Sequence, residues 1–197
     1  GVNFSHAQKI GNLDFVMGGH KFSDDGFRML ETEERARFNT NLKYNFKKIP
    51  GLAVGVNTNM MNTKGGLFFL WQNYDSAYIP QGRNIQRYNN TRFNVDPFIT
   101  FYKGSNKLSL RNRYFKTSNV NDKNQGSDAE LYYSELQYQK RFKNNLNITS
   151  GAVYMEQQVL GDSLYGKHSG QNMAGYIQAD KKFFDKLPVS IGLRGEF

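Results

Sequence analysis

Residues 35–46 alternate strictly between two kinds of side chain. One set is polar (Arg35, Arg37, Asn39, Asn41, Lys43 and Asn45), and the other is mainly apolar (Ala36, Phe38, Thr40, Leu42, Tyr44 and Phe46). A period of two residues predicts a β-strand with one polar and one apolar face. The run is about as long as a tilted strand that crosses a bilayer, and it ends in an aromatic residue just before a short turn.

The same alternation recurs along the chain and predicts an all-β fold. We expect ten strands, at 2–8, 13–22, 34–47, 52–62, 92–102, 107–115, 129–142, 146–155, 172–183 and 189–197. Only 38% of the residues are hydrophobic, which favours a sheet with one apolar face over a thick core. Because no stretch approaches about 18 apolar residues, any crossing of a membrane would use strands.

Short and long connections alternate between these strands. Tight turns are expected near 9–12, 47–51, 103–106, 143–145 and 185–188, and long polar segments near 23–33, 63–91, 116–128 and 156–171. In an antiparallel meander this order places all tight turns at one edge of the sheet and all long loops at the other. That asymmetry is typical of outer-membrane proteins, so the sequence predicts an antiparallel transmembrane β-barrel.

Aromatic residues gather beside the tight turns. They are Tyr44, Phe46, Phe101, Tyr102, Phe142, Phe183 and Phe184. Rings at one height would form a girdle at a membrane interface, although Tyr and Phe also favour strands in general. Pro97 cannot donate a hydrogen bond to a sheet, so we expect a bulge or an edge position there.

The composition narrows the possible chemistry. The net charge of +9 suggests an anionic partner, but the basic residues are spread over alternating strand positions and are interpreted mainly as one polar sheet face. The chain has no cysteine, which excludes disulfides and thiolate chemistry. His6, His20 and His168 lack the spacing of metal ligands. We therefore expect no catalytic residue, no metal, no cofactor and no enzyme activity.

The segment 63–92 is the best candidate for ligand binding. It combines aromatic rings with guanidinium groups, which suit a sugar, an aromatic chelate or an anion. Alternatively, the rings pack the loop against itself and its neighbours. The candidate ligand-binding residues are Trp71, Tyr74, Tyr78, Arg83, Arg87 and Tyr88.

Several segments resemble the TonB-dependent receptors, which are plugged importers of the outer membrane of Gram-negative bacteria. The resemblance is carried by residues 35–46, Ile49-Pro50-Gly51-Leu52, residues 53–57, Asp96-Pro97-Phe98, Leu164-Tyr165-Gly166, residues 172–182 and Gly192-Leu193-Arg194-Gly195-Glu196. It implies a barrel of about 22 strands filled by a plug. Residues 1–197 are then expected to be a mid-barrel portion of a single barrel domain, without the plug domain or the Ton box.

The resemblance also implies a function. The full protein would bind an extracellular solute through its long loops and import it with energy from the inner-membrane TonB complex. Its partners would be outer-membrane lipid, its own plug domain, the TonB complex and a solute such as an iron chelate, haem, cobalamin, a glycan or a peptide, but no nucleic acid. Arg35, Arg37, Lys43 and Arg141 would face the lumen, where they would hold the plug or steer an anionic substrate.

Two other functions are compatible with the sequence. The first is a passive, porin-like or structural outer-membrane barrel. The second is a soluble sheet that binds nucleic acid through its positive charge and stacking rings.

Overall fold

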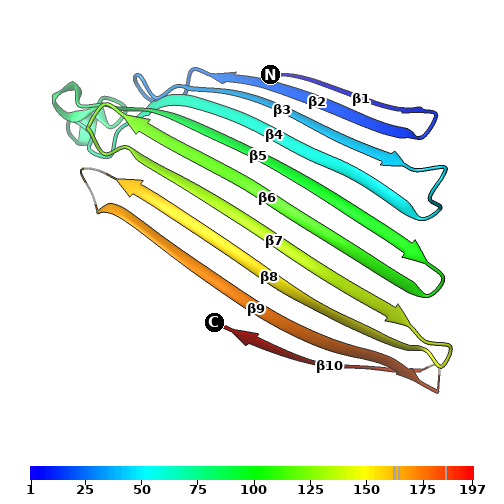
Figure 1. Cartoon of the computed structure of the whole chain (residues 1–197). Coiled ribbons are helices and arrows are strands. Elements are labelled where there is room, and N and C mark those ends of the chain that lie inside the picture. Colours follow the sequence, from blue (N-terminus) through cyan, green and yellow to red (C-terminus); the bar gives the residue numbers. More distant parts are fainter. Residues whose placement is uncertain (162, 164, 185) are drawn as a thin grey trace.

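The computed structural model of the chain is one sheet of ten antiparallel strands, each paired with its neighbours in sequence (Figure 1). The structure describes residues 1–161, 163, 165–184 and 186–197, with the backbone alone for residue 83. The strands are β1 (Val2–Ile10), β2 (Leu13–Asp24), β3 (Glu33–Asn45), β4 (Leu52–Leu67), β5 (Gln86–Lys103), β6 (Asn106–Asn121), β7 (Ser127–Arg141), β8 (Leu146–Gly161), β9 (Gly166–Phe183) and β10 (Leu187–Glu196). The expected antiparallel all-β fold is confirmed.

Several strands extend further toward the long loops than the sequence predicts. Six segments assigned to long loops belong to strands, so that assignment is wrong for them: 63–67 in β4, 86–91 in β5, 116–121 in β6, 127–128 in β7, 156–161 in β8 and 166–171 in β9. Polar residues and glycine predominate on both faces of these segments, which removes the alternation on which the prediction depends. Their backbones still pair, because ladder hydrogen bonds do not require apolar side chains.

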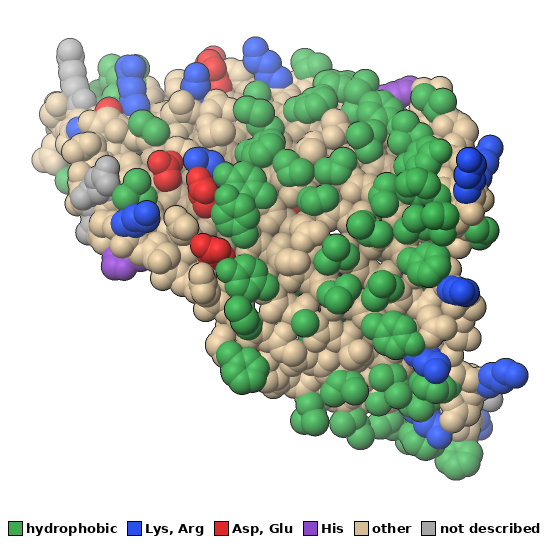
Figure 2. Space-filling view, in the orientation of Figure 1, with side chains coloured by type: hydrophobic (Ala, Val, Ile, Leu, Met, Phe, Trp, Pro, Cys, Tyr) green, Lys and Arg blue, Asp and Glu red, His purple; other side chains and the backbone are tan. Residues whose placement is uncertain are grey.

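Pairing brings most of the apolar side chains of the strands to one face, here called the apolar face. The opposite face is called the polar face. One line of directly opposed residues crosses the apolar face from β1 to β10. It consists of Ile10, Leu13, Tyr44, Val54, Ile99, Leu110, Leu136, Ala152, Gly175 and Gly195. Figure 2 shows hydrophobic side chains spread over the strands on this face.

The same line measures the stagger of the strands. It starts at Ile10, the last residue of β1, but meets β9 at Gly175, eight residues before Phe183 at the end of that strand. The stagger therefore averages about one residue per strand. With a rise of about 3.3 Å per residue and a spacing of about 4.8 Å between strands, the strands incline by about 35° to the normal of the turn edge. Strands of membrane barrels tilt by about 35–45°.

The sheet has no conventional core on its apolar face. Leu136 is 49% exposed and Leu193 is 75% exposed. The buried side chains Ala53, Val153 and Ala174 instead lie on the polar face. Their register shows this, because Ala53 is opposite Asn45, Val153 is opposite Glu135, and Ala174 is opposite Val153. Among the described residues, no helix is long and apolar enough to span a membrane.

Pro97 lies in an inner strand, so the expected bulge or edge position is wrong. The ladder between β5 and β6 omits Asp96 and Pro97, yet the register is the same on both sides of the gap. Proline lacks an N–H to donate, so the ladder loses pairing without any shift. Arg113 bridges the gap from β6, with its Nε and Nη2 each donating to a carboxylate oxygen of Asp96 at 2.8 Å.

Candidate membrane face and solute site

Two rows of aromatic residues cross the apolar face. The row near the tight turns contains Tyr44, Phe101, Tyr138 and Phe183, with Phe46, Phe142 and Phe184 in the adjoining turns. The second row, nearer the loops, contains Phe93, Tyr114, Tyr132 and Tyr154. Tyr102 belongs to neither row, because it lies opposite Lys107 on the polar face. Its assignment to the girdle was wrong, since a shift of one residue changes the face.

The second row follows the stagger of the strands. The ring centroids of Phe93 and Tyr114 are 6.4 Å apart and those of Tyr114 and Tyr132 are 4.9 Å apart. The residue opposite Tyr132 on β8 is Glu156. Tyr154 lies two residues closer to the tight turns than Glu156. The row therefore runs parallel to the line of turns rather than along the hydrogen bonds.

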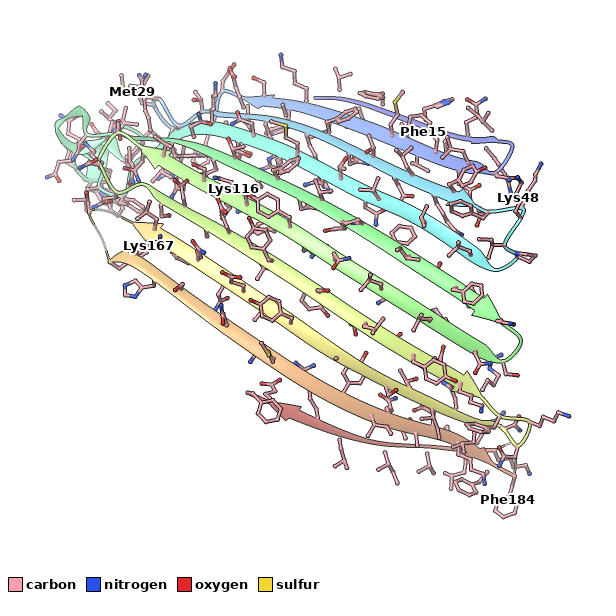
Figure 3. The ribbon with its side chains drawn as sticks, in the orientation of Figure 1. Phe15, Met29, Lys48, Lys116, Lys167 and Phe184 are labelled. Atoms are coloured by element: carbon pink, nitrogen blue, oxygen red, sulfur yellow. The ribbon has the colours of Figure 1, made fainter. Side chains whose placement is uncertain are left out.

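The two rows enclose an apolar band. On β5, Phe101 lies eight positions after Phe93. This separation is about 27 Å along the strand, or about 22 Å along the normal of the turn edge after correction for a tilt of about 35°. Membrane barrels carry an outward apolar band about 25 Å tall. Charged groups return just beyond the second row, where the Lys116 Nζ lies 2.7 Å from Glu130 Oε1 (Figures 2 and 3).

A hollow of about 600 Å³ lies on the polar face near the loops. Three lines of opposed residues cross it: the first runs through Glu33, Gly65, Tyr88 and Asn121, the second through Arg35, Thr63, Asn90 and Asn119, and the third through Arg37, Met61, Arg92 and Thr117. Its lining residues are Glu33, Arg35, Met61, Thr63, Leu67, Phe69, Gln86, Tyr88, Asn90, Arg92, Asn119 and Asn121. The hollow thus combines guanidinium, phenol, amide and apolar groups.

The polar groups of this hollow differ in how far they are paired within the protein. Arg35 forms an ion pair with Glu33 through its terminal nitrogen, and its guanidinium lies 5.9 Å from the ring centroid of Phe22. Its Nε and the Oδ1 of Asn90 are buried and have no hydrogen-bond partner among the described residues. Arg92, unlike Arg35, forms no ion pair within the described part of the chain. The lining therefore combines positive charge with buried polar atoms that lack a partner within the described residues.

Glycine at position 65 orients the aromatic wall of the hollow. A Cβ added there would lie 2.6 Å from the hydroxyl oxygen of Tyr88, so the tyrosine ring occupies the space that a side chain would take. The ring of Tyr88 consequently lies over the neighbouring strand β4 and forms part of the wall of the hollow.

The structure separates the residues that the sequence grouped together. Tyr88 joins Arg35 in the hollow, whereas Arg87 is opposite Gly66 on the other face. Arg37 lies near the hollow and donates from Nε to Asn59 Oδ1 at 2.7 Å. Lys43 and Arg141 share the polar face with Arg35 but lie at the turn edge, far along the strands. The side chain of Arg83 lies outside the described residues.

The connection from β4 to β5 is folded on itself and on the connection from β2 to β3. Phe68 is buried, and the guanidinium of Arg28 lies 4.7 Å from its ring centroid. The backbone N–H of Met29 donates to the carbonyl of Tyr78 at 2.9 Å. A side-chain hydrogen bond to Glu31 raises the pKa of Arg28, so its positive charge is held in place.

Three of the predicted ligand-binding residues lie on this folded connection and remain accessible. Trp71 is 55% exposed, Tyr74 94% and Tyr78 61%. Trp71 pairs through its backbone with Pro80, which forms a small bridge at the base of the tip. The connection uses Phe68 for internal packing, and the ring of Tyr78 lies edge-on at 6.0 Å from that of Phe27 in the β2–β3 connection. Trp71 and Tyr74 are largely exposed, and their role in ligand binding stays a prediction.

Sequence reasoning missed most of the residues that line the hollow. Asn90, Arg92 and Asn119 come from β5 and β6, and Met61 from β4. Their proximity depends on cross-strand register, which alternation alone does not reveal. Residues 86–91 carry no apolar–polar alternation, so the sequence held no signal that could have placed Asn90 in a strand.

No group of three or more His, Asp or Glu within the described ranges is placed to hold a metal ion. Comparison with models of protein families and with curated protein sequences gives no match to this chain. Functional inference therefore depends on the geometry of the sheet and on the sequence itself.

Proposed function

We propose that this chain forms part of the wall of an outer-membrane β-barrel of about 22 strands. Its apolar face would contact lipid, and its polar face would line the lumen. The observation that carries the proposal is an exposed apolar band, bounded by two aromatic rows, that follows the stagger of the strands. Such a continuous apolar surface is unfavourable in water but matches the lipid-facing surface of a barrel.

We further propose that the barrel belongs to a TonB-dependent receptor that binds and imports a solute. The resemblance of residues 35–57 and 172–182 to that family supports the class. The hollow at the loop end of the polar face supports solute binding, because it lies where a solute arriving from outside would first meet the lumen. Energised import would also use the plug domain and the inner-membrane TonB complex.

The chemistry of the hollow suits the solutes expected for such a receptor. Guanidinium groups bind carboxylates and phosphates, amides bind hydroxyl groups, and an aromatic ring stacks on a sugar or a chelate ring. Iron chelates, haem, cobalamin, glycans and peptides each carry some of these groups.

The membrane location can be tested by cysteine scanning, since the chain contains no cysteine. Single cysteines replace adjacent residues that face opposite ways: Asn41 and Leu42, Arg111 and Leu110, Gln178 and Ile177. Each is labelled with an environment-sensitive fluorophore after reconstitution into vesicles. Brominated lipid should quench probes at Leu42, Leu110 and Ile177, and aqueous iodide should quench their neighbours. Equal quenching within each pair would contradict the proposal.

Solute binding can be followed through Trp71, the only tryptophan. The reconstituted chain is titrated with a ferric chelate, haemin, cobalamin, an oligosaccharide and a peptide while its emission is recorded. The variants Arg92→Gln and Tyr88→Ala should weaken any binding detected, because both side chains line the hollow. Arg87→Gln is the matched control on the opposite face. An equal loss in the control would exclude the hollow as the site.

A further inference from the structure

The positive charge of the chain is concentrated at one edge of the sheet. We define the turn edge as the tight turns together with the four nearest residues of each adjoining strand. Twelve of the 26 lysines and arginines lie there: Lys9, Lys43, Lys47, Lys48, Lys103, Lys107, Lys140, Arg141, Lys143, Lys181, Lys182 and Lys186. Of the 17 carboxylates, Asp14, Asp180 and, by its sequence position, Asp185 belong to the same edge.

The rest of the chain is electrically balanced. It keeps 14 basic residues and 14 carboxylates, so the net charge of +9 arises entirely at the turn edge. Figure 2 shows the corresponding blue side chains along the right-hand border, and Figure 3 labels Lys48 there. Near the loops, by contrast, Lys116 is paired with Glu130.

Lysines of the turn edge adjoin the aromatic row on the apolar face. The Nζ of Lys140 lies 5.0 Å from the ring centroid of Phe142, and that of Lys181 lies 4.8 Å from Phe183. Lys103 and Lys140 share this face, each opposite Asn106. A lysine at the end of an apolar band lays its stem along the band and places its ammonium in the head-group region.

The chemistry of this edge favours phosphate groups of lipids over a protein partner. Eleven of the twelve cations are lysines, with Arg141 the exception. Lysine is a flexible point charge that accommodates a mobile phosphate, whereas a fixed carboxylate on a protein is better matched by the rigid fork of arginine. The lysines also stand at the boundary of the apolar band, at the depth that head groups occupy.

We propose that the turn edge binds anionic phospholipid, with Lys103, Lys140 and Lys181 contacting the phosphates. The proposal rests on the membrane location proposed above. Charge complementarity selects lipids such as phosphatidylglycerol over zwitterionic phosphatidylcholine.

The test compares two quenching lipids at one reporter. Leu108 lies on the apolar face, two residues from Asn106, so a fluorophore on Leu108→Cys reports on lipid at this edge. The probe is reconstituted into phosphatidylcholine vesicles that contain either brominated phosphatidylglycerol or brominated phosphatidylcholine. Phosphatidylglycerol should quench more strongly. In the triple variant Lys103→Gln, Lys140→Gln, Lys181→Gln its relative association constant should fall by about fivefold or more, since one lysine near an anionic surface contributes about that factor.

A matched triple variant controls for charge alone. Lys21, Lys64 and Lys167 lie on the same face at the opposite ends of their strands and form no ion pair within the described residues. Replacing all three with Gln should leave the preference unchanged. Equal quenching by the two lipids, or equal loss in both triple variants, would overturn the proposal. Suppression of the preference by inorganic phosphate, but not by chloride of the same ionic strength, would assign the edge to free phosphate and also overturn it.

Failure of the membrane location would give a different result. In that case neither brominated lipid would quench probes at Leu108 or Leu110, whatever the lysines are. Quenching by both lipids to the same extent would retain the membrane location and reject the lipid selectivity.

Discussion

The hydroxyl group of Tyr176 on β9 donates a hydrogen bond of 2.6 Å to Glu135 on β7, although β8 lies between the two strands. The tyrosine ring crosses β8 over Gly151, where an added Cβ would lie 2.5 Å from its hydroxyl oxygen. Gln137 donates to the same hydroxyl oxygen at 2.9 Å. One side chain thus links three strands on the polar face, and glycine makes the crossing possible.

Gly151→Ala should destabilise the sheet by displacing this ring. Loss of the two hydrogen bonds, one of them to a carboxylate, is expected to lower the free energy of unfolding by about 1–3 kcal/mol. Urea unfolding in detergent micelles would measure the change. Gly175→Ala is the control, because no atom lies within 4 Å of a Cβ at that position. Equal effects of the two substitutions would contradict the role of the ring.

Leu110→Arg should destabilise the sheet in a bilayer because it places a charge in the apolar band, and not because packing is lost. Leu110 lies inside the apolar band, where an arginine is expected to cost about 2–4 kcal/mol. Ser118→Arg lies on the same face beyond the second aromatic row and should cost about 0–1 kcal/mol. Unfolding of both variants in vesicles gives the comparison. A cost that is the same at both sites would argue against a bilayer boundary at Tyr114.

The Asp96 and Arg113 pair should contribute measurably to pairing of β5 with β6. The two hydrogen bonds are parallel and bridge a ladder gap, but Arg113 is half exposed, so we expect a coupling free energy of about 1 kcal/mol in a double-mutant cycle with Asp96→Asn and Arg113→Gln. A cycle on Arg194 and Glu196 is the control, since both are half exposed and belong to one strand. That cycle should give a value close to zero. Similar coupling free energies in the two cycles would show that the Asp96–Arg113 pair does not stabilise the ladder gap between β5 and β6.

Arg28→Gln should loosen the packing between the β2–β3 and β4–β5 connections. The change removes the cation–π contact with Phe68 and the ion pair with Glu31. Hydrogen exchange of the Met29 amide, which donates to Tyr78, should accelerate by about tenfold. Lys64→Gln is a charge-matched control away from this contact. Unchanged exchange in Arg28→Gln would show that the backbone hydrogen bonds alone hold the connections together.

Alternation predicted every strand because each carries a stretch in which one face is apolar and the other polar. It failed at the loop-side ends of β4 to β9, for example at 63–67 and 86–91, where polar residues and glycine predominate on both faces and the backbone ladder defines the strand. The error also hid that Arg87 and Tyr88, as neighbours in a strand, face opposite ways. The hollow itself could not be predicted, because bringing Arg35 to Asn90 and Asn119 requires the register of three strand pairs.

The stagger of about one residue per strand also has a consequence for how such a wall can change in evolution. From one strand to the next, the aromatic rows shift along the strand direction by about as much as the tight turns do. The shift of two residues between Glu156, which is opposite Tyr132, and Tyr154 is an example. Duplication or loss of one hairpin would therefore alter the circumference of a barrel while leaving its hydrophobic height unchanged. In the proposed barrel, the bore could then become wider or narrower in a membrane of the same thickness.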